Sequence, residues 1–503
     1  MNVVLIALDT QRADHLGCYG YGRRTSPFID SIARRGVLFE RCYAPNIPTH
    51  PSFTTMLTGK EAITHNIVNI GGGVPLADGV RLLPEILKEH GYATAAVDSM
   101  GRHFERGFEE YATYKWDRSN PMVLRRAETV TAKALPVIAR LREQPRPFFL
   151  FIHYWDPHTP YLPPPPYRRK FYPRDRDPYD PRNHSMDEAW TWEAFKWYFH
   201  EWMPGVTDAE YVVNLYDGET SYLDRHLRPI FQALATRPEG RARSSAPAFR
   251  LGVGGDPAAA GSDGTLVIVT ADHGEVLNEQ LGYFDHHGLY EGNVRVPLIL
   301  YWPGKLPAGR RVPGLVQNLD LAPTVLELAG VPDHERMEGL SLLPSVFGLR
   351  DGNYDELYLS EATWEVKRAI RTDRWKFIDS IEPDPHGRAM QELFDLEADP
   401  CEQHNLVDEF PAQARELHAR LAAWVARRLA ETGRTVDPLR EQGRCATRIG
   451  EPKPGEIVGA GATPLHRRRK AAAVDIPAPE ELGAPNEAKD KAGGAALHGY
   501  VER

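Results

Sequence analysis

Residues 266–275 read Leu-Val-Ile-Val-Thr-Ala-Asp-His-Gly-Glu, an unbroken apolar run that ends in an acid, an imidazole and a glycine. Residues 3–9, Val-Val-Leu-Ile-Ala-Leu-Asp, repeat the pattern near the N-terminus. Short apolar runs of this kind are typical of strands that are buried on both faces of a parallel sheet. Ligands of open α/β sheets bind beyond the carboxyl ends of the strands, so we expect Asp9, Asp272 and His273 to meet in one crevice.

Two carboxylates and an imidazole are suitable ligands for a divalent metal ion. The sequence therefore predicts a metal site at the ends of these two strands. The alternative is that Asp9, Asp272 and His273 only cap strands and turns.

Strand-like and helix-like segments alternate through the first two thirds of the chain. The strand-like segments are 3–9, 92–98, 147–154, 265–271 and 297–302, and the helix-like segments are 26–36, 81–90, 208–235 and 319–330. Such alternation predicts an α/β fold with a mostly parallel sheet sandwiched by helices. We assign residues 1–350 to this catalytic domain.

The sequence changes character after about residue 355. Candidate strands lie at 357–361, 367–371, 374–379 and 391–396, and a candidate helix lies at 410–432. We predict that residues 351–445 form a small C-terminal α+β subdomain with an antiparallel sheet and a packed helix. Residues 446–503 are rich in Pro, Ala, Gly and charge, so we expect a disordered tail.

Two insertions interrupt the catalytic domain. Residues 156–206 are rich in Pro, Tyr, Trp and Arg and are too long for a plain connector. They either shape the substrate site or pack onto the body of the domain. Residues 237–263 are poor in apolar side chains, and we expect them to be a mobile insertion.

Composition limits the class of protein. The chain has 503 residues, 42% of them hydrophobic, and a formal net charge of −9. This balance is that of a globular chain, and it opposes a nucleic-acid partner, which requires a basic face. We find neither a signal-peptide pattern nor an apolar stretch of about 18 residues, and the four cysteines lack metal-type spacing. We expect a cytoplasmic protein with free thiols and no membrane partner. A homo-oligomer is possible on the basis of the sequence.

A hydroxyl group stands where a helix is predicted to begin. Residues 46–59 read Asn-Ile-Pro-Thr-His-Pro-Ser-Phe-Thr-Thr-Met-Leu-Thr-Gly, in which Thr49 suits the N-cap and Pro51 the first turn. Backbone N–H groups and the helix dipole at this place stabilise an alkoxide. Thr49 is therefore a candidate nucleophile, and the alternative is that it only caps the helix.

The chain resembles the sulfatase family of the alkaline phosphatase superfamily. The residues that carry the resemblance occur in the family's order, in segments 9–20, 49–59, 151–160, 270–275, 286–299 and 371–400. They begin with Asp-Thr-Gln-Arg-Ala-Asp-His-Leu-Gly-Cys-Tyr-Gly and cover roughly residues 1–430. The resemblance implies an alkaline phosphatase-like fold and a hydrolase that acts on anionic esters.

Two features differ from the usual pattern of the family. Sulfatases make a formylglycine from Cys or Ser in a Cys/Ser-x-Pro-x-Arg motif, whereas this chain has Thr49 and Phe53 at the first and last positions. The resemblance then implies an unmodified Thr nucleophile, as in relatives that act on phosphodiesters. The pair Asp272-His273 replaces the usual Asp-Asn, resembles the phosphonate monoester hydrolase branch, and favours Mn or Zn over Ca.

From the residues and the resemblance together we predict the following roles. One divalent metal ion is held by Asp9, Thr49, Asp272 and His273, and the catalytic residues are Thr49, His158 and His286. His158 is the expected proton donor to the leaving oxygen, because imidazole titrates near neutral pH. Further contacts to the substrate are assigned to His287 and Asn69. Arg102 and His103 either contact the oxyanion or belong to a solvated loop.

Three functions remain open at this point. The first is a metal-dependent hydrolase that cleaves phosphate diester or phosphonate ester bonds through Thr49. The second is a sulfatase that acts on sulfuric esters without formylglycine. The third is a non-catalytic relative that binds a metal or ligand. The substrate of either enzyme is a small anionic ester.

Overall fold

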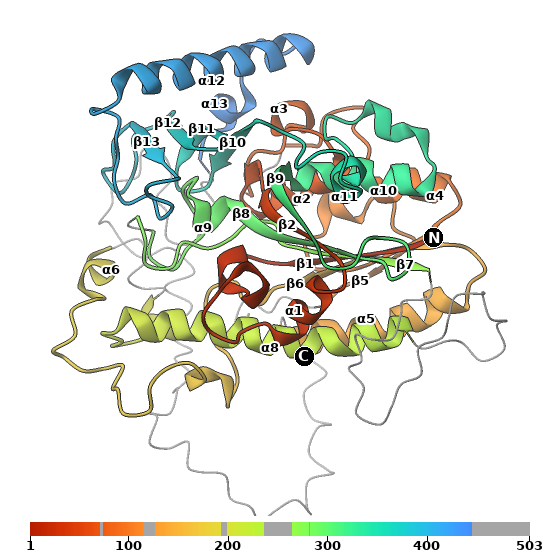
Figure 1. Ribbon diagram of the computed structural model, residues 1–503, viewed down its shortest axis with the longest axis horizontal. Helices are drawn as coiled ribbons and strands as arrows, with labels where there is room; N and C mark the ends of the chain where they lie inside the picture. The colour runs from red at the N-terminus through yellow and green to blue at the C-terminus, as the bar shows by residue number, and fades with distance from the viewer. Residues whose placement is uncertain (71–73, 115–125, 193–198, 236–263, 281, 445–503) are drawn as a thin grey trace, which may run out of the picture. The chain divides into compact units, whose positions relative to one another are not determined.

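An eight-stranded mixed sheet contains all the strands predicted for the catalytic domain (Figure 1). The computed structural model describes residues 1–70, 74–114, 126–192, 199–235, 264–280 and 282–444. The strand order is β5-β4-β6-β1-β7-β8-β2-β9. Their bounds are β1 Asn2–Leu8, β2 Val37–Tyr43, β4 Ala93–Val97, β5 Glu110–Ala112, β6 Phe148–Tyr154, β7 Thr265–Thr270, β8 Arg295–Tyr301 and β9 Arg310–Gln317. Strand β1 is parallel to both of its neighbours, and only β8 runs antiparallel to the strands beside it.

Helices cover both faces of this sheet (Figure 1). One face carries α1 (Pro27–Ala33), α5 (Ala127–Glu143) and α8 (Ala209–Ala235), and the other carries α2 (Thr49–Thr58), α4 (Leu83–Glu89) and α10 (Leu321–Ala329). The side chains of β1 alternate between two hydrophobic cores, with Ile6 in one and Leu5 in the other. Every β1 residue from Val3 onward is buried, as the apolar run predicts. The predicted α/β fold is confirmed.

A second, five-stranded sheet has the order β13-β12-β11-β10-β3. The strands are β3 Asn46–Ile47, β10 Glu356–Ala362, β11 Val366–Thr372, β12 Trp375–Ser380 and β13 Gln391–Asp395, and α12 (Pro411–Glu431) packs on them. Strands β10 to β13 are antiparallel, as predicted, but β3 joins them in parallel beside β10. The residues just before Thr49 therefore lie in the C-terminal sheet, and this sheet fixes the start of α2.

Shorter helices complete the described chain. They are α3 Ala62–His65, α6 Asp187–Thr191, α9 Glu291–Val294, α11 Leu343–Val346 and α13 Pro438–Gln442. None of the helices within the described ranges is both long and apolar enough to span a membrane. Residues 1–449 form one compact unit, and the division at residues 350 and 445 stays a prediction. The predictions for 237–263 and 446–503 fall outside the described residues.

One local prediction is wrong. Thr49 is the first residue of α2, and Pro48 occupies the cap position that we predicted for Thr49. The hydroxyl is therefore not used to cap its own helix: its recorded hydrogen-bond partner is the Nε2 atom of His273, at 3.2 Å.

Candidate functional site

Asp9 and Asp272 are neighbours because β1 and β7 are parallel and in register. Ala7 pairs with Thr270, so each carboxylate lies two residues beyond a paired position. The Thr10 backbone N–H donates to Asp272 Oδ1 at 3.2 Å. Together with His273, these side chains place three ligand atoms within 4.8 Å of one another, all fully buried. The three side chains therefore meet as predicted.

The environment of the two carboxylates suits a cation. Asp9 Oδ1 and Asp272 Oδ2 are buried and accept no hydrogen bond from the described residues. Burial, with the nearby charge of Asp9, raises the pKa of Asp272 to about 6. Buried carboxylate oxygens are costly unless a proton, a hydrogen bond or a metal satisfies them. The residues therefore fit a divalent metal ion.

The ring of His273 directs one nitrogen to this crevice. Its Nδ1 lies 2.9 Å from the Gly274 carbonyl oxygen, which can only accept, so Nδ1 carries the proton. Nε2 is then a lone-pair donor, 3.2 Å from Asp272 Oδ2 and 3.2 Å from Thr49 Oγ1. A carbonyl that fixes the tautomer of a histidine in this way is the usual arrangement at metal sites. Thr49 Oγ1 and Asp272 Oδ2 thus lie at the same distance from one ring nitrogen of His273.

Ser52 fixes α2 relative to the strand that carries the ligands. Its hydroxyl donates to the Asp272 carbonyl oxygen at 2.5 Å and accepts from Asn318 Nδ2 at 3.0 Å. Because Ser52 lies one turn beyond Thr49, these bonds hold the N-terminus of the helix against the crevice. The first backbone N–H groups and the positive end of the helix dipole are therefore close to Thr49 Oγ1.

His153 belongs to the site, although the sequence did not lead us to predict a role for it. Its Nε2 lies 3.1 Å from Asp9 Oδ2 and its Nδ1 lies 2.8 Å from Asp98 Oδ1. Burial lowers the pKa of His153, but the bonds to the two carboxylates outweigh burial and raise it to about 10. The charged ring orients Asp9 and offsets part of its negative charge. The register of β6, which pairs His153 with Ala7, is the signal that could have revealed this residue.

His158 and His286 lie side by side next to the crevice. The ring centroids of His158 and His286 are 4.9 Å apart, and those of His286 and His273 are 4.9 Å apart in a stacked arrangement. Nδ1 of His286 lies 3.3 Å from Asp285 Oδ1 and 3.5 Å from Glu275 Oε1. Both predicted catalytic histidines are therefore brought to the predicted metal ligands.

The structure separates the other two predicted substrate contacts from this group. His287 points to the C-terminal sheet, where its Nε2 lies 2.7 Å from His386 Nε2 and 4.0 Å from Glu365 Oε1. Asn69 lines a pocket to which His50, the residue after Thr49, also contributes, and its Nδ2 donates to the Gly443 carbonyl oxygen at 3.4 Å. Neither side chain belongs to the three-residue cluster of Asp9, Asp272 and His273.

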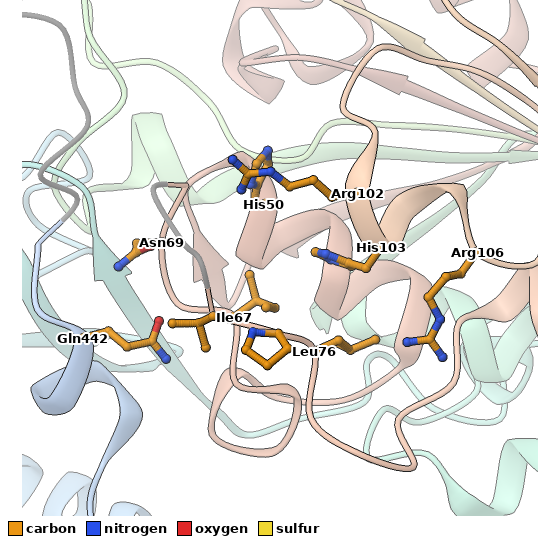
Figure 2. A pocket seen from close by; sticks show the side chains of 10 residues that line it. His50, Ile67, Asn69, Leu76, Arg102, His103, Arg106 and Gln442 are labelled. Atoms are coloured by element: carbon orange, nitrogen blue, oxygen red, sulfur yellow. The ribbon is translucent and has the colours of Figure 1, made fainter.

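The pocket beside Thr49 has a volume of about 380 Å³ (Figure 2). Its walls come from α2, from the loops that follow α3 and β4, and from α13. The residues are His50, Ile67, Asn69, Val74, Pro75, Leu76, Arg102, His103, Arg106 and Gln442. Arg102 and His103, which the sequence left between two interpretations, therefore line a cavity. His50 links this cavity to the nucleophile, because it is the residue after Thr49.

Comparison with known proteins gives matches along most of the chain. Residues 1–241 match the family model Sulfatase, and residues 279–429 match the model N-sulphoglucosamine sulphohydrolase, C-terminal. An N-acetylglucosamine-6-O-sulfatase of Bacteroides thetaiotaomicron is 24% identical over 83% of this chain and 84% of its own length.

Solved structures share the fold. A structure described as a complex with D-glucosamine-2-N,6-O-disulfate has a TM-score of 0.65 and 19% identity, over 87% of this chain and 99% of that one. The phosphonate monoester hydrolase of Agrobacterium radiobacter has a TM-score of 0.63 and 22% identity, over 85% and 96%. The disulfate complex and the phosphonate monoester hydrolase thus share the fold of this chain.

Proposed function

Because the chain belongs to the sulfatase family of hydrolases, we propose that it cleaves phosphate diester or phosphonate ester bonds with Thr49 as the nucleophile. The observation that carries this proposal is the position of Thr49 Oγ1 at the N-terminus of α2, 3.2 Å from Nε2 of His273, which forms a cluster with Asp9 and Asp272. An unmodified threonine at this place supplies an alcohol nucleophile directly, without conversion to an aldehyde hydrate.

Asp9, Thr49, Asp272 and His273 would hold the divalent ion. When bound, the ion supplies positive charge that lowers the pKa of a hydroxyl group and polarises an oxygen of the substrate. Because one ligand is an imidazole and the rest are oxygens, we propose Mn or Zn rather than Ca.

Thr49, His158 and His286 have separate roles in the proposed reaction. Thr49 Oγ1 loses its proton to solvent and forms the new bond to phosphorus while the bond from phosphorus to the departing ester oxygen breaks. His158 gives a proton to that departing oxygen. His286 donates a hydrogen bond to an oxygen of the transferring group, since its ring lies against His273. Water then cleaves the ester on Thr49 and restores the hydroxyl.

Sulfate esters are the second candidate substrate. The observation in their favour is the N-acetylglucosamine-6-O-sulfatase match, which extends over 84% of that relative. In-line attack by Thr49 on sulfur would use the same residues in the same roles. The two candidates differ in the reacting atom and in the charge that the site must stabilise.

Matched nitrophenyl substrates separate these candidates: a phosphate diester, a phosphonate monoester, a phosphate monoester and a sulfate. Each is measured with protein loaded in turn with Mn, Zn and Ca. We expect the highest kcat/KM for the diester or the phosphonate, with Mn or Zn. A higher kcat/KM for the sulfate would reject the first candidate in favour of the second.

His286 offers a test of the contact to the transferring group. We expect His286→Ala to lower kcat/KM about 10²-fold, the usual effect of losing one donor to a developing oxyanion. His286→Lys should stay within about 10-fold of wild type, because an ammonium group also donates to an anion. The neighbouring substitution His287→Gln is the control, since His287 faces His386. The assignment fails if the His287 variant loses as much activity as His286→Ala.

A further inference from the structure

The pocket next to Thr49 carries a cation that is not neutralised. Two arginines line it, and they differ in their partners (Figure 2). Arg106 is paired with Glu85 at 3.0 Å, so its charge is already offset. Arg102 Nη1 donates to the Ile70 carbonyl oxygen at 3.1 Å. Among the described residues, no carboxylate oxygen lies within 4.0 Å of the Arg102 guanidinium nitrogens, so Arg102 has no ion-pair partner there. The charge of Arg102 is therefore available to a ligand in the pocket.

The arginine is also placed close to the nucleophile. In Figure 2 the guanidinium group of Arg102 overlaps the ring of His50, which follows Thr49 in α2. Arg102 acts on both histidines of the pocket, because its charge contributes to lowering the pKa of His50 and of His103. The charge of Asp9 also acts on the pKa of His50, so an anion bound to Arg102 would lie near the cluster of Asp9, Asp272 and His273.

His103 lies next to Arg102 in the lining of the pocket and brings no second charge. Burial, with the charges of Arg106 and Arg102, lowers the pKa of His103 to about 4, so this ring is neutral at pH 7. Because the Thr54 hydroxyl donates to the His50 carbonyl oxygen at 2.7 Å, its 2.9 Å contact with His103 Nε2 is a hydrogen bond that the ring donates. The other ring nitrogen then carries a lone pair and donates nothing to an anion, so the attraction for an anion comes from Arg102.

The rest of the lining suits a compact organic body. Ile67 and Leu76 give the middle of the pocket an apolar surface, Asn69 and Gln442 lie at one end beside Ile67, and His103 and Arg106 lie at the other end (Figure 2). A volume of about 380 Å³ is at the small end of the range for ligand pockets. It accommodates one ring with its substituents rather than a long chain.

We propose that Arg102 binds a second anionic group of the substrate, so that the preferred substrate is an ester of a small ring that also bears a carboxylate, sulfate or phosphate. This inference rests on the proposed function, because it takes the reacting ester to lie at Thr49. It assigns Arg102 to specificity and not to the chemical step. The substrate class is therefore an ester with a second negative charge, either on the departing alcohol or on the group transferred to Thr49.

The test compares a nitrophenyl ester with its ring-carboxylated positional isomers, using the ester class that the wild-type enzyme hydrolyses best. We expect at least one isomer to have a lower KM than the plain ester. Arg102→Gln should remove that preference, raising KM for the carboxylated ester about 10- to 100-fold, as for loss of a hydrogen bond to a charged group. The plain ester should keep its kcat and KM within about 3-fold. Arg102→Lys should keep part of the preference, and Arg415→Gln, at an exposed site on α12, should keep all of it.

Two kinetic results would overturn the inference: wild-type enzyme that prefers none of the isomers, or an Arg102→Gln variant that loses the same activity on both esters. The second would move Arg102 to the transferring group. If no ester is hydrolysed, the proposed function fails first, and calorimetric binding of the carboxylated ester decides the inference separately. Weaker binding to Arg102→Gln than to wild type would uphold the anion site, and equal binding would reject it.

Discussion

Alanine in place of Thr49 is expected to lower kcat by at least about 10³-fold, on the scale seen when a nucleophile is removed from an enzyme. Thr49 is the first residue of α2, and its hydroxyl lies 3.2 Å from His273 Nε2. The proposed reaction begins with attack by this hydroxyl, so the variant has no nucleophile at this place. Because Thr49 does not cap its own helix, the substitution should leave the melting temperature nearly unchanged. Steady-state kinetics and a thermal melt measure the two effects.

Two controls accompany this variant. Thr49→Ser keeps an oxygen at the same position and should stay within about 10-fold of wild type. Thr435→Ala removes an exposed threonine and should have no effect. Activity of Thr49→Ala close to that of the wild type would show that another group, or water itself, attacks the substrate.

Removal of the metal should abolish turnover and should destabilise the protein. In the stripped protein the two buried carboxylates repel each other, and the charged ring of His153 offsets only part of the charge of Asp9. Bound metal at 100 times its Kd stabilises by about 2.7 kcal/mol. In Asp272→Asn the neutral amide removes the repulsion with Asp9. We therefore expect the stripped variant to be more stable than the stripped wild type at pH 8, by roughly 1 to 3 kcal/mol. With metal present, the order should reverse.

The matched control for this crossover is Asp320→Asn. Burial also raises the pKa of Asp320 to about 6, and the residue is fully buried, but it belongs to none of the metal-like clusters within the described residues. Its stability change should be the same with and without metal. Chemical unfolding with added Mn, with added Zn and with chelator measures all of these values. If Asp272→Asn changes the free energy of unfolding by the same amount with and without metal, the proposed metal site is contradicted.

The sequence predicts this fold well where apolar runs are unbroken. Strands β1 and β7 are buried on both faces, so their sequences are unbroken apolar runs that can be recognised. Their parallel pairing brings Asp9 next to Asp272. Strand β2 was missed because Glu40 and Arg41 interrupt its pattern. Helix α5 was missed as well; it contains Pro136, a residue that normally signals a helix end.

The site was predicted in part for a related reason. Residues next to a strand end can be placed from sequence, but partners that depend on sheet order cannot. His153 bridges Asp9 and Asp98 because β6 lies between β4 and β1, and no spacing in the sequence reveals that order. His286 and His287 are adjacent in sequence, yet His287 turns to His386, a residue 99 positions away.

The measurement that tests the central claim most directly is mass spectrometry of the protein after rapid acid quench during turnover. The substrate is the ester with the highest kcat/KM, and the comparison is the quenched Thr49→Ala variant. We expect the peptide containing Thr49 to gain the mass of one phosphoryl, phosphonyl or sulfuryl group, and the variant to gain none. A modified peptide elsewhere in the chain, or hydrolysis with no adduct under any quench time, would contradict Thr49 as the nucleophile.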